Sequence, residues 1–415
     1  MKNIETLGRQ AQKAARALAL VGSAQKDKAL AAIAAALRAG EGEVLAANQA
    51  DIAEAEQNGM GKGMLDRLTL TEDRIENIAK AVEEIIALPD PVGQVDGGSV
   101  RPNGLSITRV RVPLGVVGII YEARPNVTAD AAALCLKSGN ACILRGGREA
   151  VKTNLALGKI MREAAAKAGL HADIIQVVED TDRKTAAQMM KATGLIDVLI
   201  PRGGVGLIRA VVENAAVPVI QTGVGNCHVY LDSPCDPEMA VKIIENAKCS
   251  RPSVCNAAET LLVHRDVAET ILPMAKAALD RYSVQLRGCP ETRRILGEAV
   301  LPATEEDYFT EFNDYILAVR VVDSLEEAID HIRRYGTGHS EAIVTDDYSH
   351  SRKFTQQIDA AAVYVNASTR FTDGGEFGLG AEIGISTQKL HARGPMGLME
   401  LTTTKYIVQG SGQIR

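Results

Sequence analysis

The first part of the chain carries apolar residues at a spacing of three and four. Between residues 4 and 87, Leu, Ile and Ala recur at that helical period. Gly40 and Gly59 lie where helix ends are expected, and Thr69 with Glu72 forms a capping-box pattern before a further apolar run. The pattern predicts an all-helical N-terminal segment that covers one face of a larger domain.

The alternation of a β-strand follows over residues 99–112. Polar residues lie on both sides of Gly104, which indicates a protruding ribbon rather than a core strand. The C-terminal residues 401–415 alternate again and end polar. Because an edge strand with unpaired backbone groups favours pairing, we expect these two segments to pair across a subunit boundary in a homodimer or larger homo-oligomer.

From Val112 onward, apolar strand-like runs alternate with helical stretches. Strands separated by helices imply a parallel sheet covered on both faces, as in a nucleotide-binding α/β domain. The strand-like runs are 115–120, 141–144, 174–178, 198–200 and 217–220, and the helical stretches lie near 127–137, 149–168, 183–192 and 205–214. A second set of β/α units follows over residues 229–365, with strands near 260–263, 315–322, 342–344 and 362–365. The fold class is therefore α/β, with two parallel-sheet domains.

Composition and charge narrow the class of partner. The 415 residues are 46% hydrophobic and 24% charged, with a formal net charge of −6 and no long Lys/Arg run. These values are typical of a globular protein and argue against nucleic acid or an anionic membrane as the main partner. A small-molecule metabolite is the favoured ligand.

The cysteines indicate a reducing compartment. There are seven, an odd number without framework spacing, as expected of reduced thiols in a cytosol. No Cys-x-x-Cys pair occurs, so we expect no metal site. No apolar run reaches membrane length, and Arg16 interrupts the only stretch that resembles a signal peptide, residues 14–24. We therefore expect a cytoplasmic protein.

The candidate for chemistry is the stretch 250–259. In it, Cys255 follows an Arg251-Pro252 turn and precedes a run of small residues. A thiol there is a candidate nucleophile, because a nearby cation such as Arg251 and backbone N–H groups lower the pKa of a cysteine. The alternative is a buried structural cysteine, which is the commoner state of a lone cysteine.

Two glycine-rich turns follow predicted strands. They are Arg145-Gly146-Gly147-Arg148 and Arg202-Gly203-Gly204-Val205-Gly206, whereas the dinucleotide fingerprint Gly-x-Gly-x-x-Gly and the P-loop are absent. Such turns let backbone N–H groups reach a phosphate, and their arginines suit a 2′-phosphate. The alternative, plain tight turns with solvated arginines, stays equally open.

Several strings, in chain order, are similar to those of the aldehyde dehydrogenase superfamily, and the resemblance covers nearly the whole chain. The run 111–118 resembles the entry strand of that superfamily. The turn 122–128 has Asn126 where the superfamily keeps its oxyanion donor, and Cys255 matches the nucleophile. Glu311-Phe312 resembles the pair that holds the nicotinamide ribose, and 363–366 resembles the late strand that lines the tunnel.

Within the superfamily, the chain resembles the γ-glutamyl phosphate reductase family more closely. The strings that carry this resemblance are 121–126, 225–229, 251–256, and 328–332 followed by 335–343. The resemblance implies NADPH-dependent reduction of L-glutamyl 5-phosphate to L-glutamate 5-semialdehyde with release of phosphate, the second step of proline synthesis. It also raises transient contact with glutamate 5-kinase as a partner interaction.

The resemblance also assigns the domains. Residues 1–98 and 113–225 are expected to form a nucleotide-binding domain with N-terminal helices, and 226–370 a catalytic domain. Residues 371–400 are expected to return to the nucleotide-binding domain, and 99–112 with 401–415 to form an oligomerisation ribbon.

One stretch departs from the oxidising aldehyde dehydrogenases. Those enzymes carry a glutamate upstream of the nucleophile as the base for the water that hydrolyses the thioester. Here the corresponding stretch, residues 221–225, is Gln-Thr-Gly-Val-Gly and has no carboxylate. A reductase fed with an acyl phosphate must not lose its thioester to water, so the missing base fits that chemistry.

The implied mechanism gives each candidate a role. The Cys255 thiolate attacks the acyl phosphate, and the Asn126 amide with the Cys255 backbone N–H holds the oxyanion. Arg251 and Arg124 suit the phosphate or the α-carboxylate, because a guanidinium binds such groups through two parallel hydrogen bonds, and Glu122 suits the ammonium group. Surface or ion-pair roles are the alternatives.

The full set of candidates is as follows: catalytic Cys255 and Asn126; substrate-binding Arg251, Arg124, Glu122 and Asn256; cofactor-binding Arg145, Gly146, Gly147, Arg148, Gly203, Gly204, Glu311 and Phe312. Three histidines in the same strings, His228, His331 and His339, are expected to shape turns or satisfy core hydrogen bonds. Two other functions stay open: an NAD-dependent oxidising aldehyde dehydrogenase, and a non-catalytic nucleotide-binding scaffold.

Overall fold

The computed structural model describes residues 3–122 and 124–415, without the side chain of Lys62. Met1, Lys2 and Ala123, the last of which belongs to the predicted motif 121–126, lie outside the described residues. The chain forms two compact units. Unit 1 comprises Met1–Thr222, Gly378–Gly384 and Met396–Arg415, and unit 2 comprises Gly223–Phe377 and Ile385–Pro395.

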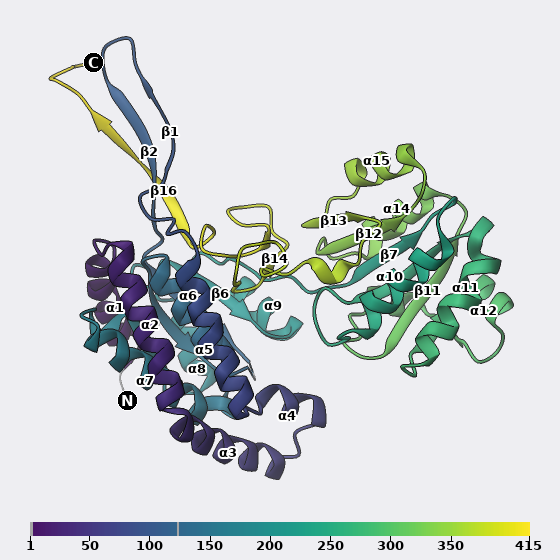
Figure 1. The fold of residues 1–415 in the computed structure, drawn as a ribbon, viewed down its shortest axis with the longest axis horizontal. Coiled ribbons are helices and arrows are strands. Elements are labelled where there is room, and N and C mark those ends of the chain that lie inside the picture. The colour runs from purple at the N-terminus through teal and green to yellow at the C-terminus, as the bar shows by residue number, and fades with distance from the viewer. Residues whose placement is uncertain (1–2, 123) are drawn as a thin grey trace. The chain divides into compact units, whose positions relative to one another are not determined.

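The N-terminal segment of unit 1 is helical, as its apolar period predicted (Figure 1). Its helices are α1 (Ile4–Leu18), α2 (Ser23–Ala39), α3 (Glu41–Gln57), α4 (Lys62–Leu68) and α5 (Glu72–Ala87). The capping box predicted at Thr69 is wrong. Thr71 is the N-cap of α5 and accepts a hydrogen bond from the Arg74 N–H, whereas Thr69 ends α4 and donates to the Leu65 carbonyl.

The sheet of unit 1 is parallel, with strand order β5-β4-β3-β6. Its strands are β3 (Val116–Tyr121), β4 (Ala141–Arg145), β5 (Ile175–Val177) and β6 (Val198–Arg202). The connections contain α6 (Asn126–Lys137), η1 (Arg148–Ala150), α7 (Val151–Lys167), η2 (Ala172–Ile174), α8 (Arg183–Met190) and α9 (Val205–Asn214). Because Tyr121 pairs with Arg202 and Ile120 with Arg145, the loops after β3, β4 and β6 begin at one edge of the sheet.

The fifth strand expected at residues 217–220 does not form. Val219 makes a single bridge to Leu199, in which the Leu199 N–H donates to the Pro218 carbonyl and the Ile220 N–H donates to the Leu199 carbonyl. Pro218 has no N–H to continue the ladder, so the apolar run stays an irregular segment beside β6.

The ribbon belongs to unit 1 and has three antiparallel strands, β1 (Val95–Val100), β2 (Ser106–Pro113) and β16 (Thr402–Gln409), in the order β1-β2-β16. It projects from the helices and sheet of that unit as an arm (Figure 1). The tail strand, expected to pair across a subunit boundary, pairs with β2 of its own chain instead, from Thr402 opposite Pro113 to Gln409 opposite Ser106. All residues of β1 and all of β16 after Thr402 are exposed.

Unit 2 contains a parallel seven-stranded sheet of order β10-β9-β11-β8-β7-β12-β13. Its strands are β7 (Cys227–Leu231), β8 (Ala258–His264), β9 (Gln285–Gly288), β10 (Leu301–Pro302), β11 (Ile316–Val322), β12 (Ser340–Val344) and β13 (Ala362–Val365). The other elements are α10 (Pro237–Cys249), α11 (Arg265–Asp280), α12 (Pro290–Leu296), α13 (Glu305–Phe309), α14 (Leu325–Tyr335), α15 (Tyr348–Gln357), η3 (Thr369–Phe371) and the short antiparallel pair β14 (Ile385–Ser386) and β15 (Gly394–Pro395).

Both faces of this second sheet are buried. Along β7, Val229 and Leu231 pack in one core cluster with α10 and α11, while Tyr230 packs in another with α14 and α15. Successive residues of a strand point to opposite faces, so helices cover both sides, as in an α/β layer fold. The predicted α/β class with parallel sheets is confirmed in both units.

The segment predicted to return as one piece, residues 371–400, is divided between the units. Residues 378–384 and 396–400 belong to unit 1, and 371–377 and 385–395 belong to unit 2. Within the described part of the chain, no helix has the length and apolarity needed to cross a lipid bilayer.

Candidate active site

Cys255 lies in the loop between α10 and β8, at the start of the second sheet. Its side chain is half-buried, and the next two residues, Asn256 and Ala257, are buried. The backbone of Gly225 passes so close that a Cβ on this glycine would lie 1.5 Å from the Cys255 carbonyl oxygen. Only a glycine allows this approach, which fixes the backbone of the candidate nucleophile against the entry of β7.

A second cysteine, Cys227, contacts the backbone of the candidate nucleophile. The fully buried Cys227 donates its S–H to the Cys255 carbonyl over 3.2 Å, and its sulfur lies 3.7 Å from His339 Nδ1. Burial, together with the negative charge of Glu341, raises the pKa of Cys227 well above its ordinary value. Cys227 therefore stays a protonated donor that positions Cys255.

Asn256, a predicted substrate-binding residue, uses its side chain inside the protein. Its amide nitrogen donates to the carbonyls of Arg370, at 3.2 Å, and Thr372, at 3.0 Å, while its Oδ1 accepts from the Arg370 guanidinium. Thr369 Oγ1 donates to the Asn256 carbonyl over 2.7 Å. Both amide hydrogens are thus committed, which makes Asn256 the anchor of the loop to η3 rather than an open donor for a substrate.

Sequence reasoning missed Arg370. Besides Asn256, it reaches the other end of the nucleophile loop, where its Nε donates to Ser250 Oγ over 3.0 Å. Burial lowers the pKa of Arg370 and the charge of Arg251 lowers it further, whereas Asp373 and Cys255 raise it. The signal available in the sequence was an arginine shortly after the late strand 363–366, but spacing alone could not bring it to Cys255.

A buried ion pair joins α10 and β8, the two elements at the ends of the same loop. Lys248, the penultimate residue of α10, lies 2.6 Å from Glu259 on β8, and both side chains are fully buried. Glu259 Oε1 also accepts the Asn313 N–H at 3.1 Å. Burial raises the pKa of Glu259 to about 7 against the opposing effect of Lys248. One carboxylate thus joins the nucleophile loop to the segment that follows Glu311.

Glu311 itself is tied to the backbone beside Cys255. Its Oε1 accepts the Gly225 N–H over 2.9 Å, and Gly225 is the glycine that abuts the Cys255 carbonyl. Its neighbour Phe312 lies under the Arg287 guanidinium, 5.1 Å from the ring centroid. Unit 2 therefore brings together Cys255, Arg251, Asn256, Glu311 and Phe312 of the predicted candidates.

The remaining candidates lie at the carboxyl edge of the unit 1 sheet. Asn126 is the first residue of α6, is exposed, and donates from Nδ2 to Asp130 Oδ2 over 3.0 Å. Burial raises the pKa of Asp130 to about 6, and the Asn126 bond opposes that effect. Asp130, one helical turn on, orients the amide and was not singled out from the sequence. Arg124, half-buried, precedes α6.

The turn at Gly203 and Gly204 binds a carboxylate of the chain. The Gly204 N–H, at the N-cap of α9, donates to Glu122 Oε2 over 2.9 Å, and a Cβ on Gly203 would lie 2.4 Å from the same oxygen. A carboxylate is favoured there because backbone N–H groups are unsatisfied at a helix start. Glu122 was predicted to bind the ammonium group of the substrate, and the glycine turn a phosphate of the cofactor. In the structure the two are hydrogen-bonded to each other.

The turn at Arg145 combines glycine backbone with a partly buried guanidinium. Gly146 is buried, and a Cβ there would lie 2.0 Å from Asn154 Nδ2, so the backbone itself lines this edge. Arg145 donates through Nη2 to the Thr181 carbonyl, while its Nε is buried without a hydrogen-bond partner among the described residues. Burial lowers the pKa of Arg145, and Glu149 opposes that effect. Gly147 follows, and the exposed Arg148 begins η1.

The histidines of the predicted strings are buried in unit 2. His228 Nδ1 lies 3.0 Å from Glu341 Oε2, which also accepts the His228 N–H. His331 packs edge-on against His228 and Tyr308. The expected core hydrogen bond therefore forms at His228 but not at His331, whose ring nitrogens have no hydrogen-bond partner among the described residues. Glu341 also lines a cavity of about 270 Å³ beside Gly336 and Asp359.

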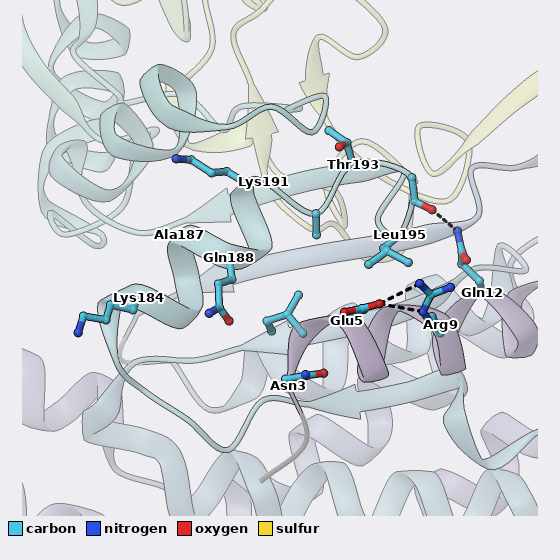
Figure 2. A pocket seen from close by; sticks show the side chains of 13 residues that line it. Asn3, Glu5, Arg9, Gln12, Lys184, Ala187, Gln188, Lys191, Thr193 and Leu195 are labelled. Carbon is cyan, nitrogen blue, oxygen red and sulfur yellow. Dashed lines mark hydrogen bonds and ion pairs between the residues drawn. The ribbon is translucent and has the colours of Figure 1, made fainter.

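A larger groove of about 1000 Å³ lies in unit 1, between α1 and the region of α8 (Figure 2). Arg9 pairs with Glu5 on its wall at 2.8 Å, and Gln12 donates to the Gly194 carbonyl. The lining residues are Asn3, Ile4, Glu5, Arg9, Gln12, Lys184, Ala187, Gln188, Lys191, Ala192, Thr193, Gly194 and Leu195. None of the predicted site residues is among them, so the groove is separate from the candidate site.

Comparison with known proteins identifies the class. Residues 1–293 and 310–407 match the aldehyde dehydrogenase family, and the chain belongs to that family. Among its curated relatives, a γ-glutamyl phosphate reductase of Heliobacterium modesticaldum is 61% identical over 408 residues, 98% of each chain. A γ-glutamyl phosphate reductase of Carboxydothermus hydrogenoformans is 59% identical over 415 residues, 100% of each chain.

Solved structures agree with the fold. The crystal structure of γ-glutamyl phosphate reductase from Thermotoga maritima matches with a TM-score of 0.97 and 48% identity and covers 100% of both chains. An engineered glycolyl-CoA reductase with bound NADP+, only 16% identical, shares the fold with a TM-score of 0.70 over 99% of this chain and 97% of its own. The resemblance and the fold class predicted from the sequence are confirmed.

Proposed function

We propose that the chain reduces L-glutamyl 5-phosphate to L-glutamate 5-semialdehyde with NADPH and releases phosphate, as the second step of proline biosynthesis. Relatives named γ-glutamyl phosphate reductase match over nearly the full chain at about 60% identity, which supports this proposal. The observation that carries the chemistry is the Cys255 loop, whose backbone is held by Gly225, Cys227 and η3.

The thiolate of Cys255 attacks the acyl carbonyl. The tetrahedral oxyanion accepts from the Asn126 amide and the Cys255 backbone N–H, and each preorganised donor of this kind is worth on the order of 3 kcal/mol. Phosphate leaves, and a thioester on Cys255 remains. When bound, NADPH supplies the hydride that reduces this thioester carbonyl. Collapse of the hemithioacetal frees the aldehyde and restores the Cys255 thiol.

Water is a poor competitor for this thioester. The stretch 221–225 has no carboxylate, and the carboxylate that reaches it, Glu311, accepts the Gly225 N–H at 2.9 Å. One oxygen of Glu311 is thus committed to a backbone donor. This supports a phosphate-coupled reductase over the alternative of an oxidising aldehyde dehydrogenase that hydrolyses its acyl-enzyme.

The cofactor site is proposed in two parts. In unit 1, Arg145 and Arg148 hold the 2′-phosphate of NADPH, and the turns at Gly146–Gly147 and Gly203–Gly204 approach its phosphates, which the buried donor at Arg145 Nε and the crowded glycine backbone support. In unit 2, Glu311 holds the nicotinamide ribose beside Phe312. The phosphate would compete with Glu122 for the Gly204 N–H.

The substrate is bound by groups of both charges. Arg251 and Arg124 are proposed to bind its phosphate and α-carboxylate, and Glu122 its ammonium group, because these charges complement a zwitterionic acyl phosphate. The protein is further proposed to work in the cytoplasm as a homo-oligomer joined through the ribbon and to contact glutamate 5-kinase transiently, which would shorten the lifetime of the free acyl phosphate.

The test is phosphate-dependent reduction of NADP+ by synthetic glutamate 5-semialdehyde. The wild-type protein should form more than one NADPH per active site only when phosphate is present, and Cys255→Ser should lower kcat by about 1000-fold or more, since it removes the nucleophile. Continued oxidation of the semialdehyde without phosphate, beyond one equivalent per active site, would contradict the reductase assignment. Iodoacetamide should abolish activity in step with alkylation of Cys255, and full activity after complete alkylation would exclude the thioester.

A further inference from the structure

Two arginines of unit 2 lie at the loop of the candidate nucleophile. Arg251 lies in the nucleophile loop four residues before Cys255 and is exposed, and Arg370 extends from η3 to both ends of the same loop. Within the described part of the chain, neither arginine forms an ion pair, and the charge of Arg251 lowers the pKa of Arg370. Two like charges at one loop favour an anion between them.

The bonds of Arg370 leave part of its guanidinium available. Nε serves Ser250 and Nη1 serves Asn256, while Nη2 takes part in neither bond. The group is half-buried, where a charge-assisted hydrogen bond is stronger than in bulk water. Arg370 can therefore hold the loop and present a donor to a ligand at the same time.

The chemistry of the acyl phosphate indicates which of its two anionic groups binds near Arg251 and Arg370. The phosphoryl oxygen is bonded to the carbon that Cys255 attacks, so the departing phosphate lies beside the thiol. The α-carboxylate is at the other end of the glutamyl chain, farther from the thiol than the phosphoryl group is. A phosphoryl group also carries more negative charge than a carboxylate, which suits two guanidiniums.

We propose that Arg370, together with Arg251, binds the phosphoryl group of the acyl phosphate, and inorganic phosphate in the reverse reaction, and so couples phosphate binding to the position of the Cys255 loop. This inference rests on the proposed function and names the residues that would bind its leaving group. It leaves the α-carboxylate to cations elsewhere, among which Arg124 is the candidate.

The test measures the reverse reaction with inorganic phosphate as the probe. Arg370→Gln and Arg251→Gln should each raise the KM for phosphate by about tenfold or more, since each removes a charge-assisted contact, and should change the KM for semialdehyde by less than about twofold. Arg370→Lys should recover part of the phosphate affinity. Arg352→Gln, an exposed arginine on α15, is the matched control and should leave both constants unchanged.

Several results would overturn the inference. A rise in the KM for semialdehyde with an unchanged KM for phosphate would assign these arginines to the α-carboxylate. A fall in kcat with both KM values unchanged would show that Arg370 only holds the nucleophile loop in place and does not bind phosphate. Arg251 takes part in neither of the bonds by which Arg370 holds the nucleophile loop, so a folded Arg251→Gln with wild-type phosphate affinity would also contradict the paired site.

A second measurement is the rate of Cys255 alkylation, which does not require turnover. Inorganic phosphate should slow alkylation of Cys255 by iodoacetamide in the wild type, and Arg370→Gln should need about tenfold more phosphate for the same protection. Equal protection in both proteins would reject the site. If the wild type showed no phosphate-dependent turnover at all, the proposed function itself would fail, whatever the variants did.

Discussion

The closest backbone contact at the nucleophile predicts the effect of a single methyl group. A Cβ at position 225 would overlap the Cys255 carbonyl oxygen at 1.5 Å and approach its Cα at 2.7 Å. Gly225→Ala should therefore displace the loop and lower kcat/KM by about 100-fold or more, since a misplacement of about 1 Å at a reacting group costs that much. Steady-state kinetics and the alkylation rate of Cys255 measure it.

The matched control is Gly42→Ala on α3. An added Cβ there meets nothing within 4 Å, and the position is helical. This variant should keep full activity and gain up to about 1 kcal/mol of stability, because alanine favours a helix over glycine. Wild-type kinetics in Gly225→Ala would show that the loop yields to the side chain and that Gly225 does not fix the nucleophile.

The buried side chain of His331 lets us predict how the stability of the fold changes with pH. Its ring nitrogens are buried without hydrogen-bond partners among the described residues, and burial lowers its pKa to about 2. An unfolded histidine has a pKa near 6.5, so the unfolded state binds the proton first and stability falls as pH drops below about 6.5. This one group should lower the free energy of unfolding by about 2 kcal/mol at pH 5 relative to pH 8.

Thermal melts from pH 8 to pH 5 check this expectation. His331→Phe keeps an aromatic ring in the cluster with Tyr308 and Tyr335 but cannot bind a proton. Its melting temperature should therefore fall less steeply below pH 6.5 than that of the wild type. Parallel curves for the two proteins would show that His331 does not titrate between the folded and unfolded states.

At the residue level, the sequence indicated the nucleophile but not its supports. Cys255 could be predicted because its neighbours Arg251 and the small residues are local in sequence. Arg370 and Asp130 could not, because their contacts to Asn256 and Asn126 depend on the tertiary fold and on a helical turn whose start was not fixed beforehand. Asn256 was predicted as a substrate ligand because spacing cannot tell whether an amide faces a pocket or a neighbouring loop.

At the level of elements, the base of the nucleophile loop depends on a buried ion pair. Lys248 on α10 and Glu259 on β8 are fully buried at 2.6 Å. Lys248→Met leaves the Glu259 charge without its partner and should lower the free energy of unfolding by about 3–5 kcal/mol. Urea denaturation measures it, and the double variant Lys248→Met with Glu259→Leu should recover most of the loss.

A second lysine on the same helix is the control. Lys242 lies 4.0 Å from Glu238, and both side chains are largely exposed, at 78% and 79%. Lys242→Met should change stability by less than about 1 kcal/mol, because solvent screens such a pair. Equal effects of the two lysine substitutions would contradict the assignment of the buried pair as a support of the loop.

Strand and helix predictions failed where local chemistry outweighed periodicity. The apolar run 217–220 contains Pro218, which lacks the N–H that a ladder needs, so it forms one bridge instead of a strand. The start of α5 shifted to Thr71 because two threonines two residues apart can each cap a helix, and hydrophobic spacing does not choose between them. The long buried strands, whose apolar runs have no such conflict, were predicted.

At the level of the whole molecule, the ribbon exposes apolar side chains. Ile407 and Val408 on β16 are 41% and 54% exposed, and Val95 and Val100 on β1 are 63% and 72% exposed. An exposed strand with such side chains favours association with another chain. The double variant Ile407→Asp with Val408→Asp should shift the protein from an oligomer toward a monomer in sedimentation analysis.

The control for the ribbon is Lys405→Asp, which changes charge on the same strand without removing an apolar side chain. It should preserve the oligomer. A monomeric wild type, or an oligomer that survives the double aspartate substitution, would contradict a role of the ribbon in assembly. The pairing of the tail could not be predicted from its alternation, because β-strand periodicity does not distinguish a partner in the same chain from one in another.

The central claim is that Cys255 holds the acyl group in a form that phosphate, and not water, removes. Intact-protein mass spectrometry of the wild type after mixing with semialdehyde and NADP+ in phosphate-free buffer tests it most directly. We expect one stable glutamyl adduct on Cys255 that disappears when phosphate is added and never forms on Cys255→Ser. An adduct on another residue, or continued NADPH formation without phosphate, would contradict the account.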